Sequence, residues 1–365
     1  MRHVRHLYVH VPFCAHRCGY CDFVTVTGHA DRHAAYVDAV LAELELEGGA
    51  LEPVLETIFL GGGTPTLIGP ALLDRLLAGL PEAAETTVEA NPETVDDALA
   101  QVLARRGVRV SLGAQSFGGR ELEVLERRAT PDTVRAAVAT LRRAGVANLN
   151  LDVLFGIPGE TREALDRDID EALRLEPDHL SCYELEAKPG TRFTFTHGAA
   201  LAQQAELLED HYEHVIERLE SAGYRWYETA NFCRDDRRCR HNLAIWRGEE
   251  YLGIGVGAVS TIGLLRRRNG PRLAPYLEAL ARREAPLRVE EVLTPDERLH
   301  ERILLGLRLD EPLALEPVRA GLDLPELEHL AGLGLVELGG GTLALTRRGR
   351  MVANDVVSRL ISEST

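Results

Sequence analysis

Three cysteines near the start of the chain are the residues best suited to chemistry. Cys14, Cys18 and Cys21 are separated by three and then two residues. A closed zinc site takes four ligands, whereas three thiolates on one loop suit an iron–sulfur cubane in which one iron keeps an open position. On spacing alone, a zinc site completed by His10 or His16, or three buried inert thiols, are the alternatives. The spacing favours a [4Fe-4S] cluster whose fourth ligand comes from outside.

A glycine-rich segment is the second candidate for ligand binding. Residues 61–66 read GGGTPT and directly follow an apolar, β-rich run. Consecutive glycines let a ligand approach the backbone and leave amide N–H groups free for a carboxylate. A glycine-rich turn alone more often serves structure. Its place after a predicted strand favours ligand binding here.

The first half of the chain contains the elements that would position these residues. Six β-rich runs alternate with segments of good helix formers, which indicates parallel βαβ units. The runs cover residues 7–11, 57–60, 86–90, 109–114, 149–155 and 179–185. We therefore predict an α/β fold built on an open (β/α)6 partial TIM barrel, with a doubly wound sheet as the alternative. In either fold, residues at the carboxyl ends of the strands converge on one site.

The alternation ends near residue 191, and this suggests three domains. We expect the partial barrel over residues 1–191 and an α+β extension over 192–290, with one long helix over 200–223 and a basic loop over 237–242. A winged-helix-like domain should follow over 291–365. This last part has more acidic than basic residues, which favours a structural or protein-docking role over DNA binding.

The composition excludes several classes of protein. The 365 residues carry a formal net charge of -16, so nucleic acid is not an expected partner. No apolar run approaches the ~20 residues that span a bilayer, and the start lacks the features of a secretory signal. Six cysteines are too few for a disulfide scaffold in a chain of this length. We expect a cytoplasmic protein with no integral membrane span.

The segment YVHVPFCAHRCGYCDF, residues 8–23, resembles the cluster loop of the radical S-adenosylmethionine (SAM) superfamily, and specifically its branch of oxygen-independent coproporphyrinogen III oxidase-like proteins. The resemblance implies that the open iron chelates the amino and carboxylate groups of SAM. One-electron reduction would then give a 5′-deoxyadenosyl radical. It also implies a set of SAM contacts at successive strand ends: Tyr8, Tyr20, Gly62, Gly63, Thr64, Glu89, Gln115, Arg127 and Asp152.

Within that branch the chain is most similar to the HemW-like heme chaperones. The segments 223–232, 240–246 and 251–258 resemble their barrel extension. Phe23 stands where the true oxidase has a further cysteine, and the long N-terminal arm of that enzyme has no counterpart here. The resemblance implies heme as a further ligand, a heme-acceptor protein as a partner, and an electron donor.

The resemblance assigns the heme iron ligand to His241, beside Trp246, in a segment similar to the HNxxYW motif of the heme chaperones. Ile245 replaces the tyrosine of that motif. Ala129 and Val259 stand where relatives commonly have histidine. The alternative is that His241 is a polar residue hydrogen-bonded to the barrel rim.

Two other functions compete with the chaperone. One is a catalytic member of the branch, a tetrapyrrole-modifying enzyme or a methyltransferase, although coproporphyrinogen dehydrogenation itself is not expected. The other is a zinc-stabilised regulatory protein. Production of 5′-deoxyadenosine would indicate the enzyme, and a colourless zinc protein would indicate the regulator.

Overall fold

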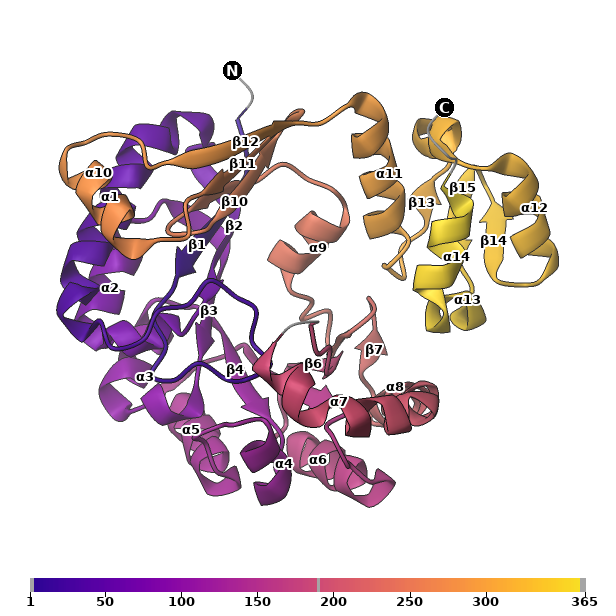
Figure 1. Ribbon diagram of the computed structural model, residues 1–365, viewed down its shortest axis with the longest axis horizontal. Helices are drawn as coiled ribbons and strands as arrows, with labels where there is room; N and C mark the ends of the chain where they lie inside the picture. The colour runs from indigo at the N-terminus through magenta and orange to yellow at the C-terminus, as the bar shows by residue number, and fades with distance from the viewer. Residues whose placement is uncertain (1–2, 189–190, 362–365) are drawn as a thin grey trace.

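The computed structural model describes residues 3–188 and 191–361. Its largest element is a nine-stranded sheet, which Figure 1 shows as a curved layer with helices on its outer side. In spatial order the strands are β7 (Arg225–Trp226), β8 (Asn231–Cys233), β6 (His179–Glu184), β5 (Leu149–Phe155), β4 (Arg109–Gln115), β3 (Glu82–Ala90), β2 (Val54–Gly62), β1 (His6–Val11) and β9 (Leu252–Ile254). Strands β1 to β6 are parallel neighbours in sequence order. Among the described residues the edge strands β7 and β9 do not pair, which confirms the predicted open (β/α)6 barrel.

Helices make the connections between β1 and β6. They are α1 (His33–Glu47), α2 (Pro70–Gly79), α3 (Asp97–Arg105), α4 (Gly119–Val124), α5 (Pro131–Ala144) and α6 (Arg162–Arg174). Sequence signals set their ends, as in α5, where the Thr130 side chain accepts a hydrogen bond from the N–H of Thr133 and Pro131 takes the first position. The same helix ends at Gly145, whose φ of 97° is left-handed. Each helix returns the chain to the same end of the sheet, so the segments after the strands gather at the other end.

Strand β1 shows how the sheet separates two environments. Leu7, Val9 and Val11 are fully buried in the main apolar core. Tyr8 and His10 point the opposite way and contact each other on the concave side. Because strand side chains alternate between faces, the outer helices cover the apolar face and the concave side is left for polar groups.

The extension continues the sheet at both edges, which the sequence did not predict. β8 pairs antiparallel with β6, whereas β9 pairs parallel with β1. Between them lies α9 (Arg240–Trp246), which Figure 1 shows on the concave side of the sheet. The basic segment 237–242 is therefore only partly a loop, because its last three residues begin α9.

The helix predicted over residues 200–223 is in fact two helices. α7 (Arg192–Gln204) and α8 (Leu208–Ser221) are separated by a 3₁₀ turn at Ala205–Leu207. The Gln204 side chain accepts from the N–H of Gly159 at 3.1 Å and donates to the carbonyl of Gly156. These bonds tie the chain to the segment after β5. A contact between distant segments therefore accompanies the break, and local helix propensity does not report such contacts.

A buried carboxylate joins the extension to the barrel. A second sheet contains β10 (Val259–Ile262), β11 (Leu265–Asn269) and β12 (Arg288–Val292), with α10 (Leu273–Ala281) between the last two strands. Glu43 of α1 is buried and accepts hydrogen bonds from Asn269 Nδ2 at 2.7 Å and from the Tyr276 hydroxyl at 2.7 Å. It also pairs with Arg288 at 3.1 Å. Three elements of the extension are thus held by one side chain of the barrel.

The C-terminal part has an apolar core of its own. Its elements are α11 (Pro295–Gly306), β13 (Leu313–Ala314), α12 (Leu324–Gly332), β14 (Val336–Gly339), β15 (Thr342–Leu345), α13 (Arg347–Met351) and α14 (Ala353–Leu360). Helices, a hairpin and final helices follow one another in the winged-helix-like order that the sequence predicts. The guanidinium of Arg350 lies 3.6 Å from the centre of the Trp226 ring, which ties this part to the extension.

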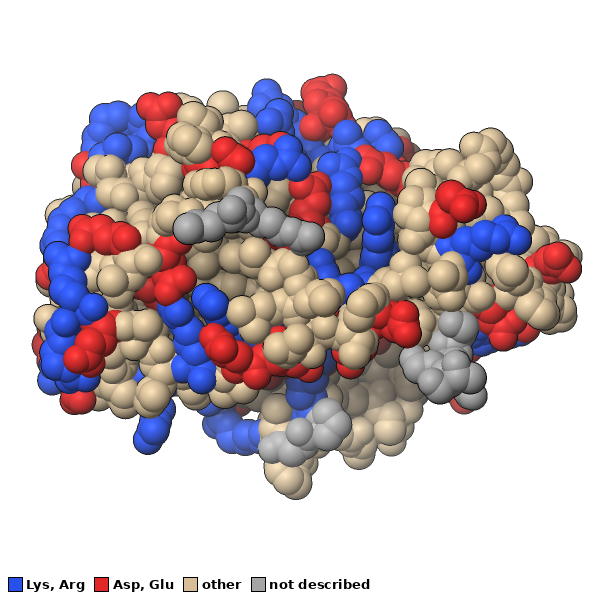
Figure 2. All heavy atoms as spheres, turned by 90° about the horizontal axis from the view of Figure 1, so that it is seen from above, with Lys and Arg blue, Asp and Glu red and all other residues tan. Residues whose placement is uncertain are grey.

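The distribution of surface charge and the apolar character of the helices concern the predictions about nucleic acid and membranes. Figure 2 shows acidic and basic side chains interspersed over the face that it draws. Within residues 3–188 and 191–361, no helix combines the length and the apolar character that crossing a bilayer requires.

The Glu43 network yields a test of the fold. We expect Glu43→Ala to lower the free energy of unfolding by about 3–5 kcal/mol, because it leaves Asn269, Tyr276 and the N–H of Gly255 without their buried partner and Arg288 with Glu47 alone. Glu45→Ala is the matched control, since Glu45 pairs with Arg283 at the surface and should cost only about 0–1 kcal/mol. Urea denaturation measures both. Equal effects of the two substitutions would contradict the conclusion that Glu43 joins the extension to the barrel.

Candidate functional site

The segments that follow the parallel strands surround a cavity of about 490 Å³. All but two of the site residues predicted from the sequence line it, namely Cys14, Cys18, Cys21, Tyr20, Gly62, Gly63, Thr64, Glu89, Gln115, Arg127 and Asp152. They come from the ends of five neighbouring strands and the loops beyond them. Parallel pairing therefore brings together residues that are far apart in the sequence.

The cysteine loop leaves β1 and is held by backbone hydrogen bonds. The N–H of Cys14 donates to the carbonyl of Val26 at 2.9 Å. The sulfur of Cys14 lies 3.8 Å from the Thr64 hydroxyl, and that of Cys18 lies 4.0 Å from the carbonyl oxygen of Glu126. Burial raises the pKa of Cys14 and of Cys21, and the neighbouring thiols raise both further. Such thiols stay protonated until a metal displaces the proton.

The glycine-rich segment packs backbone against backbone. A Cβ on Gly63 would lie 2.6 Å from the backbone carbon of Pro12, and Gly62, with φ of 105°, would meet the His10 ring at 2.2 Å. The amide groups are not free, which corrects the expectation from the sequence. The N–H groups of Gly62, Gly63 and Thr64 donate to Glu89 Oε2 at 3.0 Å, to the carbonyl of Val11 at 2.8 Å and to that of Phe13 at 2.7 Å. The segment can offer carbonyl oxygens, which suit an ammonium group better than a carboxylate.

Two partly buried acids, Glu89 and Asp152, lie on the strands beyond the glycines. Burial, followed by the charge of Asp152, raises the pKa of Glu89 to about 8. Burial also raises the pKa of Asp152, against hydrogen bonds from Asn150 Nδ2 at 2.7 Å and from Ser111 at 3.2 Å. A nearby positive charge would stabilise the ionised form of both acids, because ionising either one without it is costly. A cationic ligand such as a sulfonium fits this wall of the cavity.

An arginine connects the opposite wall to the glycine segment. Arg127 donates through Nη2 to Asn91 Oδ1 at 2.9 Å and to the carbonyl of Gly113 at 3.0 Å. Asn91 in turn donates to the Thr64 hydroxyl at 3.0 Å. The Nε of Arg127 is buried without a partner among the described residues. Gln115 has a left-handed φ of 65° where the register of β4 and β5 shifts, which turns its side chain toward the cavity.

Comparisons with known proteins follow the same division of the chain. Residues 8–172 match the radical SAM superfamily, and residues 293–352 match the HemN C-terminal domain. A Mycobacterium tuberculosis protein named heme chaperone HemW is 38% identical, over 97% of this chain and 94% of that protein. The chain belongs to the HemW heme chaperone family. A HemW of Bacillus subtilis is 32% identical, over 98% of this chain and 99% of the relative.

A solved structure shares the fold of this HemW-family chain. Coproporphyrinogen III oxidase (HemN) from Escherichia coli superposes with a TM-score of 0.82 at 23% identity, covering 100% of this chain and 91% of that one. At this identity the likeness concerns the fold alone. Membership of the radical SAM superfamily implies a [4Fe-4S] cluster and SAM, and the three thiols beside a wall that favours a cation fit both.

Tyr8 and His241 are the two predicted residues that do not line the cavity. The hydroxyl of Tyr8 is hydrogen-bonded to His10 Nδ1 at 3.0 Å, and its ring stacks on Phe59. His241 is 5% exposed, and its Nδ1 lies 2.8 Å from the Thr57 hydroxyl. Burial, followed by the charge of His6, lowers the pKa of His241 to about 3, so the ring is neutral near pH 7. The structure therefore places the expected heme ligand on the concave side of the sheet, in contact with Thr57 and His6.

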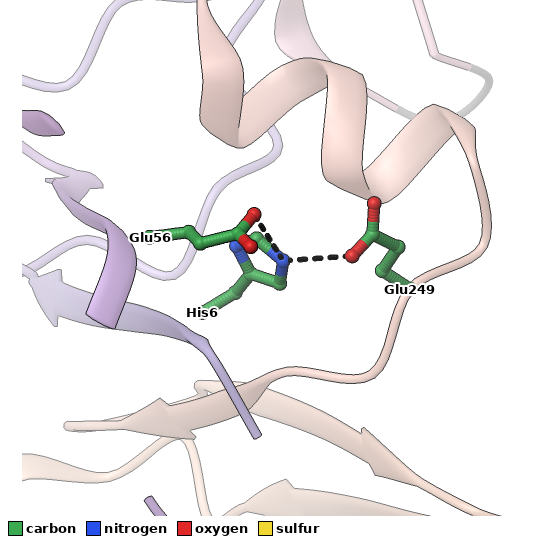
Figure 3. Close-up of side chains that lie close together, drawn as sticks. All are labelled: His6, Glu56 and Glu249. Atoms are coloured by element: carbon green, nitrogen blue, oxygen red, sulfur yellow. Dashed lines mark hydrogen bonds and ion pairs between the residues drawn. The ribbon is translucent and has the colours of Figure 1, made fainter. Parts of the chain in front are cut away.

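A polar cluster lies on the outer side of His241. Figure 3 shows His6 between Glu56 and Glu249, with its Nε2 3.0 Å from Glu249 and 4.0 Å from Glu56. Its Nδ1 lies 2.8 Å from the same Thr57 hydroxyl that contacts His241. Arg5 pairs with both carboxylates. The three groups have the types that hold a metal ion, but Arg5 already pairs with both carboxylates.

Sequence reasoning missed several residues of the cavity. Asn91 lies two residues after Glu89 on the same strand end, and that position could have identified it. Asn242 follows His241 and reaches the cavity although its neighbour does not. Arg109 begins β4, at the opposite end of the strand from Gln115, so a rule based on carboxyl ends does not find it.

The close approach at Gly63 gives one prediction. Gly63→Ala should prevent the cysteine loop from closing, because its Cβ would overlap the backbone at Pro12. We expect iron and sulfide per chain after anaerobic reconstitution to fall at least fivefold, with an unchanged circular dichroism spectrum. Gly49→Ala is the control, since nothing lies within 4 Å of its Cβ. Full iron loading of Gly63→Ala would contradict this account.

The pKa of Glu89 gives a second prediction, for the protein without cluster or SAM. The folded chain keeps the proton up to about pH 8, whereas the unfolded chain loses it near 4.5, so stability should fall as pH rises between these values. Glu89→Gln removes the titrating group. At pH 9 it should be more stable than wild type by about 3–5 kcal/mol, at about 1.4 kcal/mol per pKa unit. Urea denaturation from pH 5 to 9 tests this, and parallel pH curves for the two proteins would refute it.

Proposed function

We propose that this HemW-family chain is a heme chaperone, which binds one [4Fe-4S] cluster, SAM and heme and transfers the heme to an acceptor protein. The cluster is bound by Cys14, Cys18 and Cys21. The observation that carries the proposal is that these thiols share one cavity with the glycine segment and two partly buried acids. Names of relatives that match the chain over nearly its whole length support the role of heme.

The SAM site uses the remaining groups of the cavity. The carbonyl oxygens of the Gly62–Thr64 segment accept hydrogen bonds from the amino group, and Glu89 accepts from the ribose hydroxyls. Arg127 and Gln115 bind the polar groups on the opposite side, and Tyr20 packs beside them. The bound cluster supplies a Lewis-acidic iron and one electron. The positive charge of SAM lowers the pKa of Glu89 and Asp152 toward ordinary values, so bound SAM and ionised acids stabilise each other.

Heme binds at the mouth of the same cavity. Phe23 and Tyr183 line the cavity and are 61% and 39% exposed, which is unusual for large aromatic side chains. Leu154 and Leu185 are buried in the wall of the cavity and belong to one apolar cluster. A macrocycle that covers these rings removes them from water and stays close to the cluster. His241 joins α9 to the barrel through Thr57 and does not ligate the heme iron.

The cellular setting follows from the thiols. All six cysteines are free. Free thiols and an oxygen-sensitive cluster persist in a reducing compartment, so we place the chain in the cytoplasm. An electron donor and the heme acceptor are its protein partners there.

A heme titration of the anaerobically reconstituted protein tests the proposal. Wild type should bind heme saturably, with one heme per chain. Phe23→Ser should weaken binding about 10- to 150-fold, which corresponds to the loss of one buried aromatic contact of about 1.5–3 kcal/mol. Phe195→Ser is the matched control, because Phe195 is 82% exposed but does not line the cavity. His241→Gln should keep the stoichiometry.

Three outcomes would overturn parts of this proposal. Absence of saturable heme binding removes the chaperone function. If heme binding is lost only in His241→Gln, the heme iron is ligated by His241 of α9. Multiple turnovers of SAM to 5′-deoxyadenosine in the presence of a tetrapyrrole substrate indicate a catalytic member of the branch instead.

A further inference from the structure

A second cavity, of about 410 Å³, lies at the other end of the barrel. Its walls come from the amino-terminal half of β3, the start of β4 and the turn before β5, together with the segment that precedes α9. The cysteines lie beyond the carboxyl end of β1, so this lower cavity lies at the opposite end of the barrel from them. It therefore needs an explanation of its own.

Three arginines of the lower cavity form no salt bridge within the described part of the chain, although the charges of Glu85 and Asp152 raise the pKa of Arg109. Arg237 and Arg240 are exposed at its opening, and no ion pair of either side chain occurs among the described residues. Arg109 forms the inner wall and is 3% exposed, yet its Nε has no hydrogen-bond partner in the part of the chain that the structure describes. A buried guanidinium without a partner is costly, and an anion in the cavity would satisfy it.

The two acids of the lower cavity are already engaged. Asp236 pairs with Arg238 at 2.6 Å. One oxygen of Glu85 accepts from the N–H groups of Arg240 at 2.9 Å and of His241 at 3.4 Å, at the start of α9. Burial raises the pKa of Glu85, which favours its neutral form. Neither acid therefore neutralises the three arginines fully.

The carboxyl ends of α3 and α5 lie in the wall of the lower cavity, and the partial negative charge of their carbonyl groups repels an anion only weakly. The carbonyl of Ala104 at the end of α3 accepts from the N–H of Gly107 at 3.0 Å. The carbonyl of Leu141 in α5 accepts from Val146 N–H at 3.0 Å. Hydrogen-bonded carbonyls carry less unpaired negative charge than free ones. The arginines thus set the sign of the potential in this cavity.

We propose that the lower cavity binds a small oxyanion, namely the phosphate or carboxylate group of a small molecule, between Arg109, Arg237 and Arg240. Guanidinium groups bind such groups through paired N–H donors. The chain as a whole has a net charge of -16, so its general field repels anions and saturable binding requires a local basic site. Arg109 also lines the upper cavity, so one side chain separates the two sites.

Isothermal titration calorimetry of the reconstituted full chain tests the site, with inorganic phosphate and with succinate as separate probes. We expect saturable binding of one anion per chain, and the tighter probe shows whether phosphate or carboxylate is the preferred group. Arg237→Ala/Arg240→Ala should weaken binding at least tenfold. Arg268→Ala/Arg319→Ala removes the same charge from exposed arginines outside the cavity and should leave binding unchanged.

A charge-preserving variant keeps the test decisive if the alanine variant folds poorly. Arg237→Lys/Arg240→Lys should fold and bind the anion within about fivefold of wild type. The proposal is wrong if neither probe saturates, if the alanine variant binds as wild type does, or if both alanine pairs weaken binding equally. None of these results bears on heme binding at the upper cavity.

Discussion

The cysteine loop can exist only because backbone meets backbone at the end of β2. Gly63 lies so close to Pro12 and Phe13 that no side chain fits between them. The N–H of Thr64 then donates to the carbonyl of Phe13 at 2.7 Å and joins the two segments. This contact aligns the thiols with the strand ends that bear the acids, so the remainder of the cavity depends on it.

The second constraint is electrostatic. The concave side of the sheet collects ionisable groups, and burial makes each of them expensive to charge. The charge of Asp152 raises the pKa of Glu89 further, which prepares the wall for a cation. At the lower end, Arg109 lacks an acid that fully matches it. The two ends of one barrel therefore favour ligands of opposite charge, and the side chain of Arg109 lies between them.

The helix α9 closes the concave side and explains why its histidine is inaccessible. Glu85 accepts from the first amides of α9, and Thr57 contacts the His241 ring. Both supports come from strands of the barrel, β3 and β2. A motif that resembles a heme-binding segment thus supports the barrel through His241 and reaches the upper cavity through Asn242.

The sequence by itself determined the α/β order, the cysteine spacing and the polar residues at successive strand ends, because parallel strands bring such positions together whatever the details of packing. Only the tertiary structure decided which of those groups remain available. The amides after β2 are used by Glu89 and two carbonyls, His241 is buried, and the helix over 200–223 breaks at Gln204. Each outcome depends on hydrogen bonds and burial between distant segments, which local patterns do not contain.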